Sequence, residues 1–171
     1  MKKTIVSILL ALGACASAQA VYTGASIGYL VDSEEAYFAA RFGTSLNSSE
    51  SYVGNVEVEV GYTEESSGGV TAKLTPLMLN YRGEILGQSN WAPYYGAGAG
   101  LAKVKVSGFG ISSDDTSFAA QAFAGVAYKA SESASINLGA RYIYVDDVKL
   151  FGTNLDVGDD VAVEVGFSFR F

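Results

Sequence analysis

Apolar and polar residues alternate without a break in the last eleven residues of the chain, the segment VAVEVGFSFRF at positions 161–171. Its odd-numbered positions are all valine or phenylalanine, whereas Glu164, Ser168 and Arg170 lie at even-numbered positions. Successive side chains of a β-strand point to opposite faces, so this period of two predicts a strand with one apolar and one polar face. Its length is also about that of a tilted strand that crosses a membrane.

The same alternation recurs upstream and predicts eight strands in all. In the segment 52–63, for example, Val58 and Val60 share one face while Glu57 and Glu59 share the other. The connections are polar and turn-like, and no long helical run separates the strands, which favours an antiparallel meander of sequence neighbours. The predicted strands are residues 22–31, 36–44, 52–63, 76–85, 92–106, 117–129, 134–145 and 161–171.

Alternation alone fits two barrels, a soluble one with its apolar face inside and a membrane-spanning one with that face on lipid. The polar faces carry equal numbers of arginines and glutamates, and eight strands enclose an interior that side chains can fill. A balanced set of guanidinium and carboxylate groups fills such an interior and satisfies most of its donors. On lipid, each arginine near the midplane would cost about 2–4 kcal/mol. The sequence therefore favours a transmembrane barrel over a secreted soluble one. We expect a lumen ion-pair network of Arg41, Glu57, Glu59, Arg82, Glu84, Arg141, Glu164 and Arg170.

The start of the chain reads as a secretory signal: Lys2 and Lys3, then an apolar run, then small residues. The apolar run is shorter than the roughly 20 residues that span a bilayer as a helix. Two processing sites compete, a lipoprotein-like box ending at Cys15 and the sequence Ala-Gln-Ala ending at Ala20. A chain that inserts its own barrel needs no lipid anchor, and the first strand follows directly. We therefore expect a signal peptide of residues 1–20 and a barrel domain of residues 21–171, with lipidation as the alternative.

Charge and composition exclude several classes of function. Without Lys2 and Lys3, nine basic residues oppose 18 acidic ones, which disfavours binding to nucleic acid. The chain has no histidine, so neither histidine-assisted nucleophilic catalysis nor the commonest metal ligand is available. The carboxylate pair Glu57 and Glu59 leaves acid–base catalysis conceivable, but a structural role beside the arginines is simpler. We expect no enzyme activity, no cofactor and no metal.

Several stretches resemble the small outer-membrane β-barrel proteins, namely OmpA-type barrel domains, OmpX-like proteins and opacity-type porin-like proteins. The stretches are TPLMLNYRGE, APYYGAGAGLAKV and FAAQAFAGVAYKASESASINLGARYIYV. The terminal FSFRF, with Phe167, Phe169 and Phe171, resembles the signal that the outer-membrane assembly machinery reads. The resemblance implies an eight-stranded antiparallel barrel in the bacterial outer membrane. It further implies two periplasmic termini, longer outer loops, and periplasmic chaperones and the assembly machinery as partners.

With a periplasmic N-terminus, the outer loops would be residues 32–35, 64–69, 107–116 and 146–160, which hold most of the acidic residues. These loops could bind a surface ligand, although carboxylates in loops more often stay solvated. Lys73, Lys103 and Lys105 point outward near the outer ends of two neighbouring strands by the same parity. They either contact lipopolysaccharide phosphates or simply extend their amines above the apolar band.

Two functions remain after these exclusions. A filled polar lumen would suit a structural or surface-interaction protein that serves envelope integrity or adhesion. A narrow open lumen would suit a small porin that passes ions or very small solutes. Eight strands leave little interior space, so the filled barrel is favoured.

Overall fold

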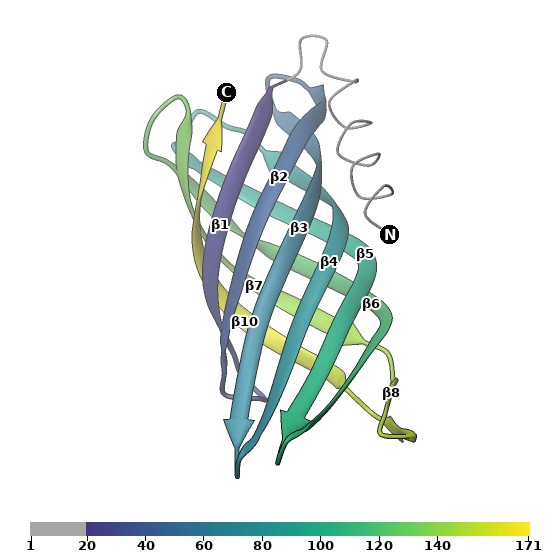
Figure 1. Cartoon of the computed structure of the whole chain (residues 1–171). Helices are drawn as coiled ribbons and strands as arrows, with labels where there is room; N and C mark the ends of the chain where they lie inside the picture. The colour runs from purple at the N-terminus through teal and green to yellow at the C-terminus, as the bar shows by residue number, and fades with distance from the viewer. Residues whose placement is uncertain (1–19) are drawn as a thin grey trace.

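The computed structural model describes residues 20–171, and within that range every regular element is a β-strand. Eight strands form a closed antiparallel barrel in the order β1-β10-β7-β6-β5-β4-β3-β2, which confirms the predicted fold class (Figure 1). The barrel strands are β1 (Val21–Leu30), β2 (Ala36–Ser48), β3 (Tyr52–Ser67), β4 (Val70–Ile85), β5 (Trp91–Gly108), β6 (Ile111–Lys129), β7 (Ala134–Val145) and β10 (Gly158–Arg170). Two short strands, β8 (Val148–Leu150) and β9 (Thr153–Leu155), form a separate hairpin.

The first and last barrel strands close the barrel. β1 pairs with β10 from Tyr22 opposite Arg170 to Leu30 opposite Ala162, so every barrel strand has a paired neighbour on each side. The start of β1 and the C-terminus lie at the same end, here named the terminal end (Figure 1). The β3–β4, β5–β6 and β8–β9 turns lie at the opposite end, named the distal end (Figure 1).

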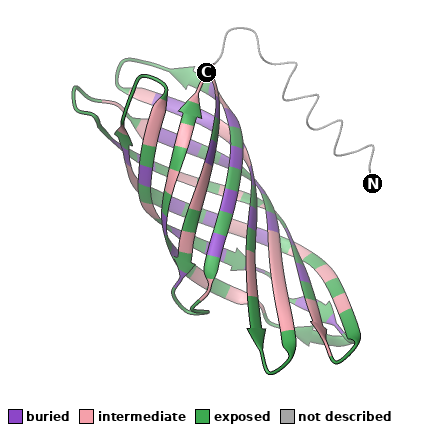
Figure 2. Ribbon diagram, turned by 60° about the vertical axis from the view of Figure 1, so that its left-hand side comes forward, coloured by how far each residue is buried: buried purple, intermediate pink, exposed green. Residues whose placement is uncertain are grey.

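The two faces of the wall are inverted relative to a soluble protein. Leu79 and Val163 on the outer face are 56% and 53% exposed, while Glu57 and Arg141 on the inner face are 0% and 1% exposed. Figure 2 shows the resulting alternation of buried and exposed residues along each strand. The outer face is therefore an apolar band, as the period of two predicts. Of the described residues, none belongs to a helix long and apolar enough to cross a membrane.

The strands β3 to β6 are longer than the sequence predicts. Residues 64–69 and 107–116, predicted as loops, are mostly strand, and only Gly68–Gly69 and Phe109–Gly110 form turns. All four turn residues have positive φ, the conformation that two-residue hairpin turns require. These extensions lie beyond the apolar band and are polar on both faces, so the alternation that marks a membrane-crossing strand is missing there.

The predicted loop at residues 146–160 is also partly regular, because it contains the β8–β9 hairpin. Its turn, Phe151–Gly152, again has positive φ at both positions. The apolar side chains of Val148 and Leu150 are buried and cluster with Val104 of β5 at the distal mouth.

Side chains fill the barrel in three layers. An apolar layer that includes Tyr37, Met78 and Ile143 lies toward the distal end. A small cluster around Tyr94 and Phe123 lies toward the terminal end. Charged and amide side chains occupy the middle of the lumen and continue past the Tyr94 cluster to the terminal mouth. The expected signal segment and Cys15 lie outside the described residues, except for Ala20.

Candidate functional site

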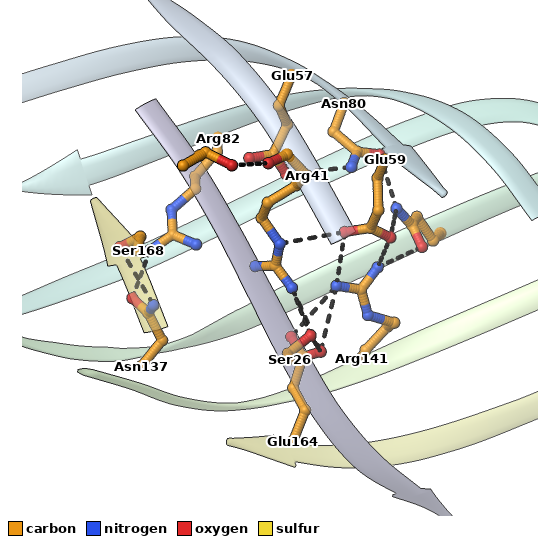
Figure 3. Close-up of polar contacts among 12 residues, drawn as sticks. Ser26, Arg41, Glu57, Glu59, Asn80, Arg82, Asn137, Arg141, Glu164 and Ser168 are labelled. Carbon is orange, nitrogen blue, oxygen red and sulfur yellow. Dashed lines mark hydrogen bonds and ion pairs between the residues drawn. The ribbon is translucent and has the colours of Figure 1, made fainter. Parts of the chain in front are cut away.

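Two arginines and two glutamates meet in the middle of the lumen and form a neutral cluster, here named the central cluster. They are Arg41 of β2, Glu59 of β3, Arg141 of β7 and Glu164 of β10 (Figure 3). Arg141 donates to Glu59 Oε2 at 3.0 Å and to Glu164 Oε1 at 3.2 Å. Arg41 lies 3.5 Å from Glu59 and 3.6 Å from Glu164. Each arginine therefore contacts both carboxylates, and the four charges cancel.

The barrel geometry explains how these four residues meet. Arg41 and Glu59 are direct cross-strand partners, whereas Glu59 and Arg141 come from strands that are not neighbours. Glu164 lies opposite Gly28, which leaves its carboxylate room to turn inward. A hydroxyl completes the set, because Ser26 Oγ accepts from Arg41 at 2.7 Å and donates to Glu164 at 3.0 Å. Charge-assisted and bidentate contacts of this kind are the strongest hydrogen bonds available to buried charges.

Three more of the expected residues lie nearer the terminal end. Arg82 Nε donates to Glu84 at 3.0 Å, and Arg170 lies 3.4 Å from the other oxygen of Glu84. The Arg82 guanidinium also stacks 3.9 Å from the ring centroid of Tyr94 and donates to Asn137 at 3.0 Å. The Arg170 side chain is 34% exposed, so this group reaches the terminal mouth of the barrel.

Glu57 lies in the lumen but takes no part in an ion pair with any described residue. Its carboxylate accepts hydrogen bonds from the Tyr22 hydroxyl and from the Asn80 amide, the latter at 3.1 Å. The pair of glutamates singled out for acid–base chemistry is thus divided. Glu59 is bound by guanidinium groups, and Glu57 by neutral donors.

The network expected from the sequence contains only charged residues, whereas the lumen also holds uncharged ones. Gln121 donates to Glu59 at 3.1 Å and to Asn80 at 2.7 Å, and so joins the central cluster to its neighbours. A methyl group at Gly98 would lie 1.9 Å from the Asn80 side-chain oxygen. Glycine at this position of β5 therefore leaves room for the Asn80 amide. The parity of the charged positions would also have found the inward tyrosines. The period of two assigns Asn80, Gln121 and Asn137 to the polar faces, and the lumen residues that the sequence analysis missed are Tyr22, Tyr37, Asn55 and Tyr94.

The three predicted outward lysines lie among carboxylates just beyond the apolar band. The register places Glu64, Lys73, Lys105 and Asp114 side by side on strands β3 to β6. Lys73 lies 2.8 Å from Glu64, and Lys103 lies 2.7 Å from Asp114. The hydrogen bond from Lys73 lowers the pKa of the Glu64 carboxyl. Two of the three lysines are therefore already paired with carboxylates, and exposed pairs of this kind are weak and exchangeable.

The β8–β9 hairpin is fixed to the inward face of the β6 extension by three alternate residues. Phe151 N donates to Ser113 Oγ at 3.3 Å, Lys149 N donates to Asp115 Oδ2 at 2.7 Å, and Ser117 Oγ donates to the Asp147 carbonyl at 3.0 Å. The hydrogen bonds from the Lys149 and Thr116 amides lower the pKa of Asp115. The hairpin is therefore held in a fixed position at the distal mouth.

Two aromatic residues of the expected assembly signal, Phe167 and Phe169, lie on the outer face of β10 at the terminal end, and Phe171 follows the last residue of that strand. Phe167 and Phe169 pack edge to face with their centroids 5.9 Å apart, and Phe171 is highly exposed. Trp91 and Tyr128 form a similar outward pair with centroids 4.9 Å apart. Aromatic pairs at the border of an apolar band are typical of membrane interfaces. Between residues 20 and 171, no three Asp, Glu, Cys or His side chains are arranged to hold a metal ion.

Comparison with known proteins agrees with this architecture. The family model of the outer membrane protein beta-barrel domain matches residues 6–171. No curated protein matches the chain significantly in sequence. Neisserial surface protein A, a solved structure, is 20% identical with a TM-score of 0.68 over 91% of this chain and 98% of that chain.

Two further solved structures are similar in fold. Ail, the attachment invasion locus protein of Yersinia pestis, is 17% identical with a TM-score of 0.57, over 90% of this chain and 97% of that chain. The outer membrane enzyme PagL is 14% identical with a TM-score of 0.53, over 86% of this chain and 97% of that chain. At these identities the likeness is one of fold, and this fold is found in an enzyme as well as in other barrels.

Proposed function

The chain belongs to the outer membrane protein beta-barrel domain family, and we propose that it is a closed, non-conducting barrel with a structural or surface-interaction role. The central cluster is the observation that carries this proposal. It occupies the middle of the lumen, between the apolar layer around Met78 and the aromatic pair Tyr94 and Phe123.

A hydrated ion would have to displace this cluster to cross the barrel. Arg141 and Glu59 are fully buried, and each is held by two or more partners. Separating such a pair leaves two desolvated charges without compensation. An ion that sheds its water would then meet the apolar layer at the distal end, which offers it few ligands. The closed state is therefore favoured over a small porin.

We assign the distal end to the cell exterior and both termini to the periplasm. The extended β3–β6 hairpins and the acidic connections lie at the distal end, where they would carry any adhesive or envelope-stabilising contact. The outward lysines Lys73, Lys103 and Lys105 would then lie at the level of the lipopolysaccharide phosphates, which could replace Glu64 and Asp114 as partners of these lysines. In this orientation Phe167, Phe169 and Phe171 lie at the periplasmic border, as an assembly signal requires.

Catalysis is not part of the proposed function. The sequence has no histidine, and the carboxylates of Glu57 and Glu59 are both buried and hydrogen-bonded within the wall. These hydrogen bonds hold the packed side chains of the lumen together. This structural role explains both glutamates, so no catalytic role is needed.

Single-channel recording in a planar bilayer tests the closed barrel. The barrel domain, residues 21–171, is refolded, and a heat-dependent gel shift verifies that it has folded. We expect no regular conductance steps at neutral pH. Regular steps that change when Arg82 is replaced by Gln would instead make the lumen an ion pathway and the protein a small porin.

A further inference from the structure

We propose that the distal mouth of the barrel is a binding site for a small amphipathic amine. Such a molecule has an apolar body, a cationic nitrogen at one end and a hydrogen-bonding group at the other. The inference goes beyond the proposed function, because it does not depend on which side of the membrane the distal end faces.

A cavity of about 420 Å³ lies in this mouth, within the size range of small-molecule sites. Its walls are apolar and come from four different strands: Leu30 of β1, Leu74 of β4, Val104 of β5 and Ile143 of β7. The β8–β9 hairpin packs beside the cavity, since Leu150 clusters with Leu74 and Val104. An apolar body of a ligand would therefore be enclosed by rigid strands rather than by loops alone.

Two hydroxyl groups at this cavity lack hydrogen-bond partners. Tyr37 and Thr63, cross-strand neighbours on β2 and β3, both line the cavity. Tyr37 is 0% exposed, and neither its hydroxyl nor Thr63 Oγ1 bonds to any described residue. Buried polar groups are nearly always paired, so two adjacent exceptions need an explanation. Both oxygens are covered in this structure, so a side chain must turn toward the cavity before a ligand can donate to or accept from its hydroxyl and supply the missing partner.

The rim of the cavity is strongly acidic. Six lining residues carry carboxylates, and the single lining cation, Lys73, is already paired with Glu64. The Asp160 carboxylate is also occupied, because it accepts from the backbone amides of Asp32 and Ser33 at 3.0 Å. The remaining rim carboxylates are those of Asp32, Glu35, Glu65, Asp156 and Asp159. The Asp159 carboxylate accepts from the Tyr142 hydroxyl, and the other four are free to attract a cation.

These features together define the ligand. The carboxylates select a positive charge at the rim, the walls select an apolar body, and the hydroxyls select a polar group at the inner end. The rim carboxylates would repel an anionic molecule of the same shape, because both are negatively charged.

Tyramine is a suitable probe, because it combines an ammonium group, an aromatic ring and a distal hydroxyl. The full barrel domain, with labelled methyl groups and embedded in lipid nanodiscs, is titrated and followed by NMR. We expect saturable shifts at the methyls of Leu74, Val104 and Ile143. We expect 4-hydroxyphenylacetate, which has the same ring and hydroxyl but a negative charge, to bind at least about tenfold more weakly.

Variants separate the parts of the site. Tyr37→Phe removes one hydroxyl and should weaken tyramine by about threefold to tenfold, but should leave binding of phenethylamine, which lacks the hydroxyl, unchanged. Ala72→Trp fills the cavity from its own wall and should abolish binding. The matched control is Thr71→Trp, one residue earlier and on the opposite face of β4, which should bind normally. A heat-dependent gel shift verifies the folding of each variant.

Three results would overturn the proposal. The first is a lack of saturable shifts at the three cavity methyls. The second is equal binding of the cationic and anionic probes, which would mean that the rim does not select charge. The third is binding that survives in folded Ala72→Trp, which would place the ligand elsewhere.

Discussion

The guanidinium of Arg141 has no access to water, so only the residues that surround it compensate its charge. It contacts Glu59 and Glu164, and it lies 5.2 Å from the ring centroid of Phe123. Its near neighbour Arg41 shares the same two carboxylates. Because the cluster holds two positive and two negative charges, its stability depends on the cancellation of all four charges rather than on any one ion pair.

Glu59→Gln should therefore destabilise the barrel by about 3–5 kcal/mol, since it leaves one buried positive charge uncompensated. Glu59→Gln combined with Arg141→Gln should cost less than the two single changes added together, by about 0.5–3 kcal/mol, because Arg41 and Glu164 still pair. Urea unfolding of the refolded barrel in lipid vesicles measures all three free energies. Strictly additive effects would show that the central cluster does not act as a unit.

For a single charged residue, the sequence predicts whether the side chain faces the lumen or the lipid, but it does not predict which side chain it contacts. The period of two assigns Arg41, Glu59, Arg141 and Glu164 to the interior, because lipid would not tolerate them outside. It cannot pair Glu59 with Arg141, since their strands meet only across the closed barrel. Residue type was also misleading for Tyr37 and Tyr94, which are aromatic but lie on the inward parity.

The β8–β9 hairpin shows how one strand can fix another element without extended pairing. Ser113, Asp115 and Ser117 present hydroxyl and carboxylate groups every second residue along β6, and the hairpin backbone bonds to all three. Asp115 is the only charged member of this set. Because its pKa is lowered by the Lys149 and Thr116 amides, its bonds to the hairpin are complete at neutral pH.

Asp115→Ala should release the hairpin, and the result should be faster proteolysis within residues 146–157 while the barrel stays folded. The native protein should behave likewise only in acid. The lowered pKa of Asp115 means that its carboxylate stabilises the attached hairpin at every pH above 3.8, the ordinary pKa of an aspartate. This stabilisation is lost as the pH falls through the lowered pKa. Limited proteolysis with an acid-tolerant protease, read by mass spectrometry, measures both effects.

Asp114→Ala is the matched control. Asp114 is adjacent in sequence, but it points outward and pairs with Lys103. Its loss should leave the hairpin protected, so equal cleavage of the two variants would contradict the role given to Asp115.

The strands themselves were predictable wherever one face meets lipid. The segments 134–145 and 161–171 stand out in the sequence, because valine, leucine and phenylalanine are needed at every second position. The β6 extension, with Ser112 to Ser117, meets water on its outer face and the polar backbone of the β8–β9 hairpin on its inner face, so it has no such requirement. Its strand character rests on the two-residue turn Phe109–Gly110, whose glycine is the one local signal of a tight hairpin.

At the scale of the whole molecule, the barrel is asymmetric along its axis. The terminal end has short turns and aromatic residues close to the border of the apolar band. The distal end carries the extended β3–β6 hairpins and the β8–β9 hairpin (Figure 1). Most of the acidic residues of the chain also belong to the connections and strand extensions at this end. This asymmetry is what gives the barrel a preferred orientation in a membrane with two different surfaces.

Cysteine labelling tests that orientation cleanly, because Cys15 is the single native cysteine and lies in the expected signal peptide. Asn154→Cys places a thiol on exposed β9 at the distal end, and Gln88→Cys places one in the exposed β4–β5 turn at the terminal end. A membrane-impermeant maleimide should label Asn154→Cys on intact cells. It should reach Gln88→Cys only after the outer membrane is made permeable.

The unaltered chain is the control for both variants, and it also reports on processing. If cleavage follows Ala20, the mature protein has no thiol and stays unlabelled even in permeable cells. A mature protein that begins at Cys15 and carries lipid would stay unlabelled too, but its mass would be higher by the six retained residues and the acyl chains. Labelling of Gln88→Cys on intact cells would reverse the assigned orientation and move the acidic mouth of the barrel to the periplasm.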